Sequence, residues 1–420
     1  MPQYLTPDIY VEEVSGGARP IEAVGTSTAA FVGVAPRADA HVNEAVAINN
    51  WTEFMREFVP EDLTTAQSTH LSNAVYGFFL NGGRRCYVVN LGAGTDVNKG
   101  LEQFAAIDEI AIVAAPGFTD AASYAAVSAH CENLQDRVAV LEAPDIRDIN
   151  LLKSVATESA TPALPADGGD AGSGGDSGSS GSSRRRDRSS TAITPSTGAL
   201  AQPTNGGYAA YYFPWIIVAD PLAPNTRVAV PPSGHIAGIW ARTDFERGVH
   251  KAPANELVRG AVGLSYRLTR DEQGDLNKIG VNCIRLFATE GIRVWGARTL
   301  TSNPEWKYLN VRRLFNMVKE SIAENTRWIV FEPNDMTLWK SIRRDVSAFL
   351  TRLWRDGAIV GATPEQAFFV KCDAETNPPD VVDAGQVVVI IGIAPSKPAE
   401  FVIFRISQFA GGTLTETSAQ

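Results

Sequence analysis

The stretch LSNAVYGFFLNGGRRCYVVNL, residues 71–91, places a helix pattern directly before a strand pattern. Residues 71–80 carry apolar side chains at helical spacing, and the turn residues Asn81-Gly82-Gly83 follow them. Residues 85–91 are a short apolar run that is typical of a strand buried on both faces. The stretch therefore predicts one helix-and-strand unit of an α/β layer.

The same alternation continues on both sides of this unit. Strands are predicted at 28–34, 110–114, 137–142 and 211–220, and a further helix at 121–131. Strands that alternate with helices over such distances predict a partly parallel sheet with helices packed on it.

A Gly/Ser-rich segment interrupts this domain between residues 154 and 208. It contains a basic cluster, Arg184, Arg185, Arg186 and Arg188. Such a composition buries too little apolar surface to offset chain entropy, so a flexible surface insertion at about 157–206 is expected. A nucleic-acid-binding arm is the alternative, and strongly salt-dependent DNA binding would favour it.

The composition is that of an ordinary globular protein of 420 residues, with 44% hydrophobic residues and a net charge of -10. The negative charge argues against bulk nucleic-acid binding. The N-terminus has no secretory signal pattern, and no apolar run is long enough to span a membrane. The scattered cysteines predict buried thiols in a reducing compartment. They are Cys86, Cys131, Cys283 and Cys372.

Two long helices are predicted near the C-terminus. The first begins at Asn303-Pro304-Glu305 and the second runs from Met336 to Asp356. One face of the second helix is apolar, and its members are Trp339, Ile342, Val346, Phe349 and Leu353. The opposite face is basic, with Lys340, Arg343, Arg344, Arg352 and Arg355. This basic face is either solvated or a contact with an acidic partner.

Both ends of the chain have strand patterns where termini are usually polar. They are residues 4–14 (YLTPDIYVEEV), 386–393 (QVVVIIGI) and 400–409 (EFVIFRISQF). These runs either complete the chain's own sheets or pair with a neighbouring copy, since an exposed strand edge is otherwise a liability.

No enzymatic site is supported by the motifs. Gly175-Asp176-Ser177-Gly178 lies in a Gly/Ser tract that cannot hold an oxyanion hole. Gly92-Ala93-Gly94 lacks the remaining elements of a phosphate-binding loop, and the histidines have no metal-ligand spacing. We therefore expect no catalytic, cofactor or metal site. An α/β enzyme with a disordered insertion stays open as the alternative.

Several motifs resemble the C-terminal region of contractile tail sheath proteins of phages, R-type bacteriocins and related injection systems. They are RGVHKAPAN (247–255), NKIGVNCIR (277–285), GIRVWGARTL (291–300) and VRRLF (311–315). TPDIYVEEV (6–14) and TSTAAFVGV (26–34) are similar to the start of the same family. The resemblance covers residues 4–36 and 235–409. His250 replaces a frequent Trp, and Ala288-Thr289-Glu290 replaces a more usual Pro-Gly-basic turn.

The resemblance implies a fold of mixed α/β and α+β class. We expect an N-terminal strand arm at 1–20 and a discontinuous α/β domain at 21–230. A C-terminal α+β sheath domain at 231–395 and a C-terminal strand arm with tail at 396–420 are expected to follow.

The resemblance also implies a structural role. Sheath subunits stack as hexameric rings around an inner tube and contract to drive it through a target envelope. The implied partners are further copies of the chain, the inner tube protein, and baseplate and terminal cap proteins, with no nucleic acid and no membrane insertion. Assembly in the bacterial cytoplasm as part of a phage tail or tail-like particle is implied; these two kinds of particle are not distinguished.

Two sets of site residues follow from the resemblance. Strand exchange between subunits is assigned to Ile9, Tyr10, Val11, Glu12, Phe401, Val402, Ile403, Phe404, Arg405 and Ile406. Contact with the inner tube is assigned first to Lys340, Arg343 and Arg344 and then to Arg352 and Arg355.

Overall fold

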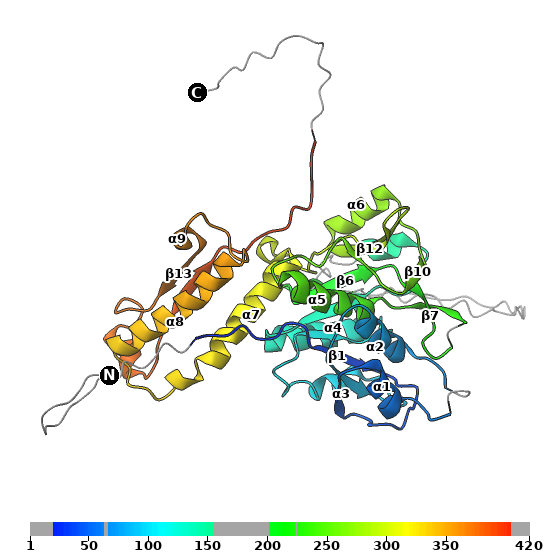
Figure 1. The fold of residues 1–420 in the computed structure, drawn as a ribbon, viewed down its shortest axis with the longest axis horizontal. Coiled ribbons are helices and arrows are strands. Elements are labelled where there is room, and N and C mark those ends of the chain that lie inside the picture. Colours follow the sequence, from blue (N-terminus) through cyan, green and yellow to red (C-terminus); the bar gives the residue numbers. More distant parts are fainter. Residues whose placement is uncertain (1–19, 63–65, 155–200, 224, 405–420) are drawn as a thin grey trace, which may run out of the picture.

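A nine-stranded sheet forms the centre of this computed structural model, which describes residues 20–62, 66–154, 201–223 and 225–404 (Figure 1). The strand order is β2-β3-β1-β4-β5-β6-β11-β12-β9. The strands are β1 Ala29–Gly33, β2 Ala45–Ile48, β3 Cys86–Asn90, β4 Ile112–Ala114, β5 Val138–Glu142, β6 Ala209–Phe213, β9 Glu256–Leu257, β11 Val281–Phe287 and β12 Gly291–Val294. Strands β3, β1, β4, β5, β6 and β11 are parallel, and the outer pairings are antiparallel. The predicted partly parallel sheet and mixed α/β class are confirmed.

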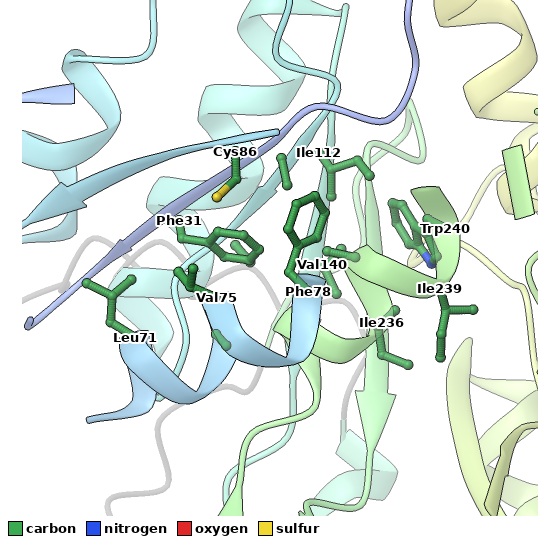
Figure 2. Packing of buried hydrophobic residues seen from close by; sticks show 14 of the residues in the cluster. Phe31, Leu71, Val75, Phe78, Cys86, Ile112, Val140, Ile236, Ile239 and Trp240 are labelled. Atoms are coloured by element: carbon green, nitrogen blue, oxygen red, sulfur yellow. The ribbon is translucent and has the colours of Figure 1, made fainter. Parts of the chain in front are cut away.

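Helices cover both faces of the central strands. On one face pack α1 Trp51–Phe58, α2 His70–Leu80 and α5 Ser233–Arg247; on the other pack α3 Val97–Glu102, α4 Ala121–Leu134 and α6 Arg270–Lys278. Along β1, Phe31 packs on the side of α2 and α5, whereas Val32 packs on the side of α3. Figure 2 shows Phe31 beside Phe78 of α2, with Trp240 of α5 farther along the same layer. A strand buried on both faces needs a continuous apolar run, which explains the sequence pattern.

Two glycines bring α5 into contact with the α2 backbone. A side chain at Gly234 would overlap the backbone of Ala74, and one at Gly238 would overlap the backbone of Phe78. The absence of a Cβ at these two positions therefore fixes how closely the two helices pack.

The prediction of a single strand at 211–220 is wrong, because the chain forms two strands there. β6 ends at Phe213, and β7, Ile216–Ala219, belongs to a separate antiparallel sheet with β8 Arg227–Val230 and β10 Ala261–Leu264. Pro214 lies between β6 and β7 and has no N–H to donate to a ladder. The apolar run therefore changes sheets at this proline.

The C-terminal part is built on α7 Leu309–Asn325 and α8 Met336–Arg355, with the short helices α9 Pro364–Ala367 and α10 Pro379–Asp383. The predicted start of the first helix is too early, because Asn303 caps only a 3₁₀ turn, Pro304–Trp306. Tyr308 instead forms a bridge with Arg298 in an extended conformation. The second helix is confirmed, and its predicted apolar stripe is buried throughout.

Short 3₁₀ turns also occur at Ile149–Ser154 and Arg327–Ile329. The predicted insertion falls largely on residues 155–200, which lie outside the described part of the chain. Residues 201–208 follow it and return to the body, where Thr204 forms a bridge with Thr301.

Candidate functional site

The described residues contain no arrangement suited to metal binding or thiol chemistry. Within them, no group of three or more His, Cys, Asp and Glu side chains could hold a metal ion. The four cysteines are buried and free, as predicted, and burial raises the pKa of the Cys86 and Cys131 thiols above the ordinary range. The segment 175–178 lies outside the described residues. Among the described helices, none has the length and apolar character needed to cross a bilayer.

A small sheet at the C-terminal end is the first candidate feature. β13 (Phe368–Lys371) and β14 (Ile390–Ile393) form an antiparallel pair that lies against α8 (Figure 1). Alternate residues of the pair pack toward α8, whereas Phe369 is 57% exposed on the opposite side. Within the described residues, each of the two strands has a strand partner on one side only. The sheet therefore offers open edges for further strands.

The strand predicted at 386–393 thus belongs to the chain's own sheet, although β14 is shorter than the prediction. For this run, the interpretation that it completes the chain's own sheet is correct. Of the run at 400–409, only residues 400–404 are described, and they belong to no strand.

The N-terminal segment reaches the α7–α8 pair before it enters β1. Ile21 is buried in the apolar cluster formed by α7 and α8, and the guanidinium of Arg352 donates to its carbonyl oxygen. The Val24 N–H donates to Ser321 Oγ at 3.0 Å. Residues 20–24 are therefore fixed to α7 and α8, and we call them the root of the N-terminal arm.

The C-terminal segment has an anchor of its own, which we call the Glu400 latch. Both carboxylate oxygens of Glu400 accept hydrogen bonds from Arg298, at 2.8 Å from Nε and 2.7 Å from Nη2. Asn277 Nδ2 donates to the same carboxylate at 3.0 Å, and the hydroxyl of Tyr308 lies at 3.4 Å. Bidentate Arg–carboxylate pairs are strong and directional.

The charge of Glu400 is stabilised by these partners. Burial raises the pKa of its carboxyl group, but the hydrogen bonds from Arg298 and Asn277 lower it by more, so the pKa lies below its usual value. The carboxylate is therefore ionised at neutral pH and holds the chain on the α/β body.

Four large apolar residues leave the body directly after this latch. Phe401, Val402, Ile403 and Phe404 are between 69% and 83% exposed and belong to no described strand. In Figure 1 this segment leads away from β13. Four consecutive exposed apolar side chains indicate a segment that is buried by a partner.

The remaining residues assigned to strand exchange lie outside the described part of the chain. These are Ile9, Tyr10, Val11, Glu12, Arg405 and Ile406. Their assignment stays a prediction.

The basic residues of α8 are all exposed, but they differ in their contacts. Arg344 Nε donates to Asp345 of the same helix at 3.0 Å, and Arg352 donates to the Ile21 carbonyl. No salt bridge joins Lys340 or Arg343 to a described residue. No salt bridge or side-chain hydrogen bond joins Arg355 to a described residue either. Lys340, Arg343 and Arg355 are therefore the cations of the basic face most available to a partner, whereas Arg344 and Arg352 each have a contact within the chain.

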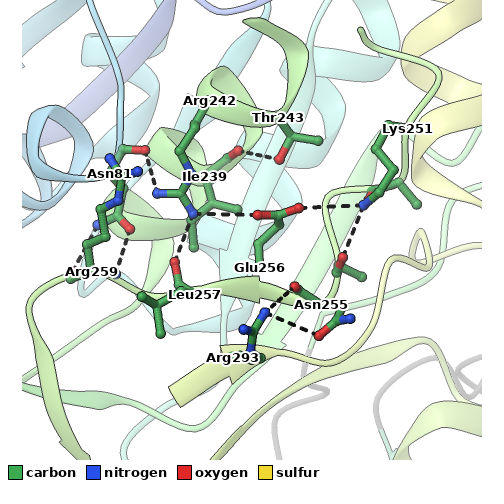
Figure 3. Close-up of polar contacts among 12 residues, drawn as sticks. Asn81, Ile239, Arg242, Thr243, Lys251, Asn255, Glu256, Leu257, Arg259 and Arg293 are labelled. Atoms are coloured by element: carbon green, nitrogen blue, oxygen red, sulfur yellow. Dashed lines mark hydrogen bonds and ion pairs between the residues drawn. The ribbon is translucent and has the colours of Figure 1, made fainter. Parts of the chain in front are cut away.

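Residues 247–255 are held by a polar network that belongs to the fold (Figure 3). Arg242, whose side chain is buried, donates to the carbonyls of Asn81 at 2.9 Å and Leu257 at 2.8 Å. Lys251 donates to carbonyls within its own turn and lies 3.6 Å from Glu256. Arg242 and Lys251 are thus satisfied inside the molecule and hold the loop in place, whereas Arg247 of the RGVHKAPAN motif is exposed.

Two features of the site were missed by sequence reasoning. The Glu400 latch joins residues that are 102 positions apart, and no local pattern signals such a pair. The second feature is a group of exposed apolar side chains in the α7–α8 connection, Val330, Phe331 and Met336. In a sequence, apolar residues between two helices are ordinarily interpreted as part of the hydrophobic core.

Two family models match adjacent parts of the chain. The phage tail sheath protein central domain matches residues 199–300, and the phage tail sheath C-terminal domain matches residues 301–409. The two matches together span half of the chain.

Curated relatives match over less than half of the chain. The tail sheath protein of Vibrio phage KVP40 is 32% identical over 177 residues, and a putative prophage major tail sheath protein of Pseudomonas aeruginosa is 29% identical over 188 residues. These alignments cover 41% and 44% of the chain, but only 26% and 47% of the two relatives. The chain thus spans less than half the length of these curated relatives.

Solved structures match over nearly the whole chain. The sheath of an extracellular contractile injection system, PVC, in its contracted state has a TM-score of 0.74 at 27% identity and covers 98% of this chain and 99% of its own. The helical sheath of the anti-feeding prophage in its contracted state has a TM-score of 0.70 at 26% identity, covering 97% and 100%.

Proposed function

Because this chain belongs to the contractile tail sheath family, we propose that it polymerises as stacked hexameric rings around an inner tube. Contraction of this polymer would drive the tube through a target envelope. One observation carries the proposal. The β13–β14 sheet has open edges, while the apolar, exposed C-terminal segment of the same chain leads away from that sheet.

If a segment of one copy added a strand to the sheet of another copy, the open β13–β14 sheet would be completed and the exposed C-terminal segment would be buried. Residues 401–406 of one copy would extend the β13–β14 sheet of a neighbour, and residues 9–12 would join a sheet of the same kind. Backbone hydrogen bonds would supply the binding, and the alternation of side chains would fix the register. The resulting lattice would join each copy to its neighbours through both arms.

The energy of each link would be modest. Burying four apolar side chains of the arm would yield on the order of 6–12 kcal/mol before costs. Ordering about eight residues would cost a similar amount. The lattice would gain its strength from many links, and a single link could move without breaking the polymer.

The basic face of α8 is the proposed contact with the inner tube. Lys340, Arg343 and Arg344 would bind an acidic tube surface, with Arg355 at the end of the same helix. Exposed ion pairs contribute only about 0–1 kcal/mol each. Such weak contacts suit a sheath that must release its tube during contraction. Arg352 is assigned instead to the root of the N-terminal arm, because it donates to the Ile21 carbonyl.

The sheath of the extracellular contractile injection system PVC is similar to this chain at 27% identity over 98% of this chain. We therefore propose an extracellular injection particle as the setting of this sheath. Baseplate and terminal cap proteins would be the further partners of such a particle.

Co-expression with the inner tube protein of the same particle tests the proposal. The wild-type chain should form sheathed tubes that are visible by electron microscopy. Changing Lys340, Arg343 and Arg344 to Glu should abolish assembly on the tube. Unchanged co-assembly of this triple variant would rule out α8 as the tube contact.

A further inference from the structure

The connection between α7 and α8 exposes a compact apolar group, which we call the 330–336 tip. Phe331 is fully exposed, and Val330 and Met336 are 63% and 58% exposed. The three residues lie within seven positions, and the connection between α7 and α8 is at the end of this helix pair that is farthest from the nine-stranded sheet (Figure 1). A surface group of this kind is typical of a binding site for a partner.

The backbone holds Phe331 in an unfavourable conformation. Its φ is 71°, in the left-handed region that bulky residues rarely adopt. Such a conformation costs about 1–3 kcal/mol and persists only where the surroundings impose it. Because the ring itself contacts solvent, the conformation gains nothing for the isolated subunit.

Hydrogen bonds on both sides of Phe331 order the connection. The Glu332 N–H donates to the Ile329 carbonyl at 3.1 Å. Asn334 donates from Nδ2 to the Gln386 carbonyl at 2.8 Å and accepts from Trp339 Nε1 at 2.8 Å. The ring of Phe331 is thus presented to solvent by an ordered connection rather than by a frayed one.

The tip is continuous with the basic face of α8. Met336 is the first residue of the helix, and Lys340 lies four positions later on the same face. Arg343 and Arg344 follow one turn further on. A partner that covers the tip would therefore also meet these cations. Because Glu332 and Asp335 of the tip are exposed as well, the partner's acidic groups must lie opposite α8, and its apolar pocket must lie opposite the connection.

We propose that the 330–336 tip inserts into an apolar pocket on an acidic protein surface, namely that of the inner tube. The proposal rests on the function proposed above. Phe, Met and Arg are enriched in interface cores, and a single aromatic anchor often dominates the affinity. The ring of Phe331 is the anchor, and the cations of α8 set the orientation of the contact.

The substitution Phe331→Gly separates binding from folding. Glycine adopts a φ near 71° without strain, so the thermal unfolding temperature should be unchanged or higher. Loss of the aromatic anchor should weaken co-sedimentation with preformed tubes by about tenfold or more. Phe245→Ala is the matched control, because Phe245 is 69% exposed on α5, outside the α7–α8 pair, and should leave tube binding unchanged.

Two results would overturn the inference. Wild-type tube binding by the Phe331→Gly variant would show that the tip is not an anchor. Loss of polymerisation in the absence of tube would assign the tip to a contact between copies of the chain instead. The triple change of Lys340, Arg343 and Arg344 to Glu tests the basic face separately, so failure of the tip and failure of the proposed function are distinguishable.

Discussion

In the nine-stranded sheet, β1, β4 and β5 have a strand on each side and helices on both faces, whereas β13–β14 has α8 on one face and open edges. Phe31 of β1 is completely buried, but Phe369 of β13 is 57% exposed. The first sheet is complete within one copy of the chain. The second has apolar strands but open edges, and we propose that strands of neighbouring copies complete it.

The largest effect should follow from removing the C-terminal arm. Deletion of residues 401–420 should abolish polymerisation and leave the body folded, because the latch and the three apolar clusters end at or before Glu400. Electron microscopy and circular dichroism would measure the two outcomes. Deletion of residues 411–420 alone keeps the apolar run and should still give polymers. Polymers formed without residues 401–420 would show that the open sheet needs no donated strand.

A matched pair of phenylalanines sharpens the comparison between the sheets. Phe31→Ala should lower the free energy of unfolding by about 3–5 kcal/mol, because it leaves a cavity between β1 and α2. Phe369→Ala should change it by no more than about 0.5 kcal/mol. Denaturant unfolding of the subunit checks both values.

The exposed face of β13–β14 should matter for polymerisation although it contributes little to the stability of the subunit. Phe369→Ala should raise the subunit concentration needed for polymerisation, since its ring faces the side that a neighbour would cover. If Phe369→Ala polymerised like the wild type, the exposed face of β13–β14 would not be an interface.

Loss of the Glu400 latch should have a smaller effect, on stability and on the mobility of the C-terminal arm. Glu400→Gln removes the charge of a partly buried, bidentate pair, so the free energy of unfolding should fall by about 1–2 kcal/mol. A spin label at position 403 should become more mobile. Glu290→Gln is the control, because Glu290 forms a surface ion pair with Arg293 at 3.1 Å that is worth at most about 1 kcal/mol. An equally restricted label in both variants would contradict the latch.

A further prediction is a pH dependence of the body that does not involve the arm. Glu142 of β5 is buried and accepts from the Gly117 and Ser233 N–H groups at 2.6 and 3.2 Å. Burial raises its pKa to about 7 despite these bonds. The folded state then retains a proton that the unfolded chain releases, so wild-type stability falls as the pH rises from about 5 to 7.

The Glu142→Gln variant isolates this effect, because its side chain does not titrate. Relative to the wild type, its free energy of unfolding should rise by about 1 kcal/mol per pH unit in that window. Parallel pH profiles for the two proteins would show that Glu142 has an ordinary pKa.

Local patterns predicted the elements whose burial is periodic. The stripe of α8 from Trp339 to Leu353 was identified because one periodicity extends through the helix. The run of β3 was identified because a strand buried on both faces is apolar throughout. The run at 211–220 was misread, since periodicity alone does not show that Pro214 moves the chain from one sheet to another.

The functional features were harder to predict because they depend on tertiary structure. Arg298 and Glu400 become partners only when the C-terminal segment returns to the α/β body. The exposure of Phe331 contradicts the ordinary expectation that a phenylalanine between two helices is buried. Only its positive φ and its position at the end of the helix pair identify it as a surface residue.

The most direct test of the account is a high-resolution electron microscopy map of the polymer in which residues 400–409 can be traced. The account predicts that residues 401–406 of each copy form a strand on the β13–β14 sheet of a neighbouring copy. A segment that instead folds back onto its own β13–β14 sheet, or that contacts no strand, would contradict it.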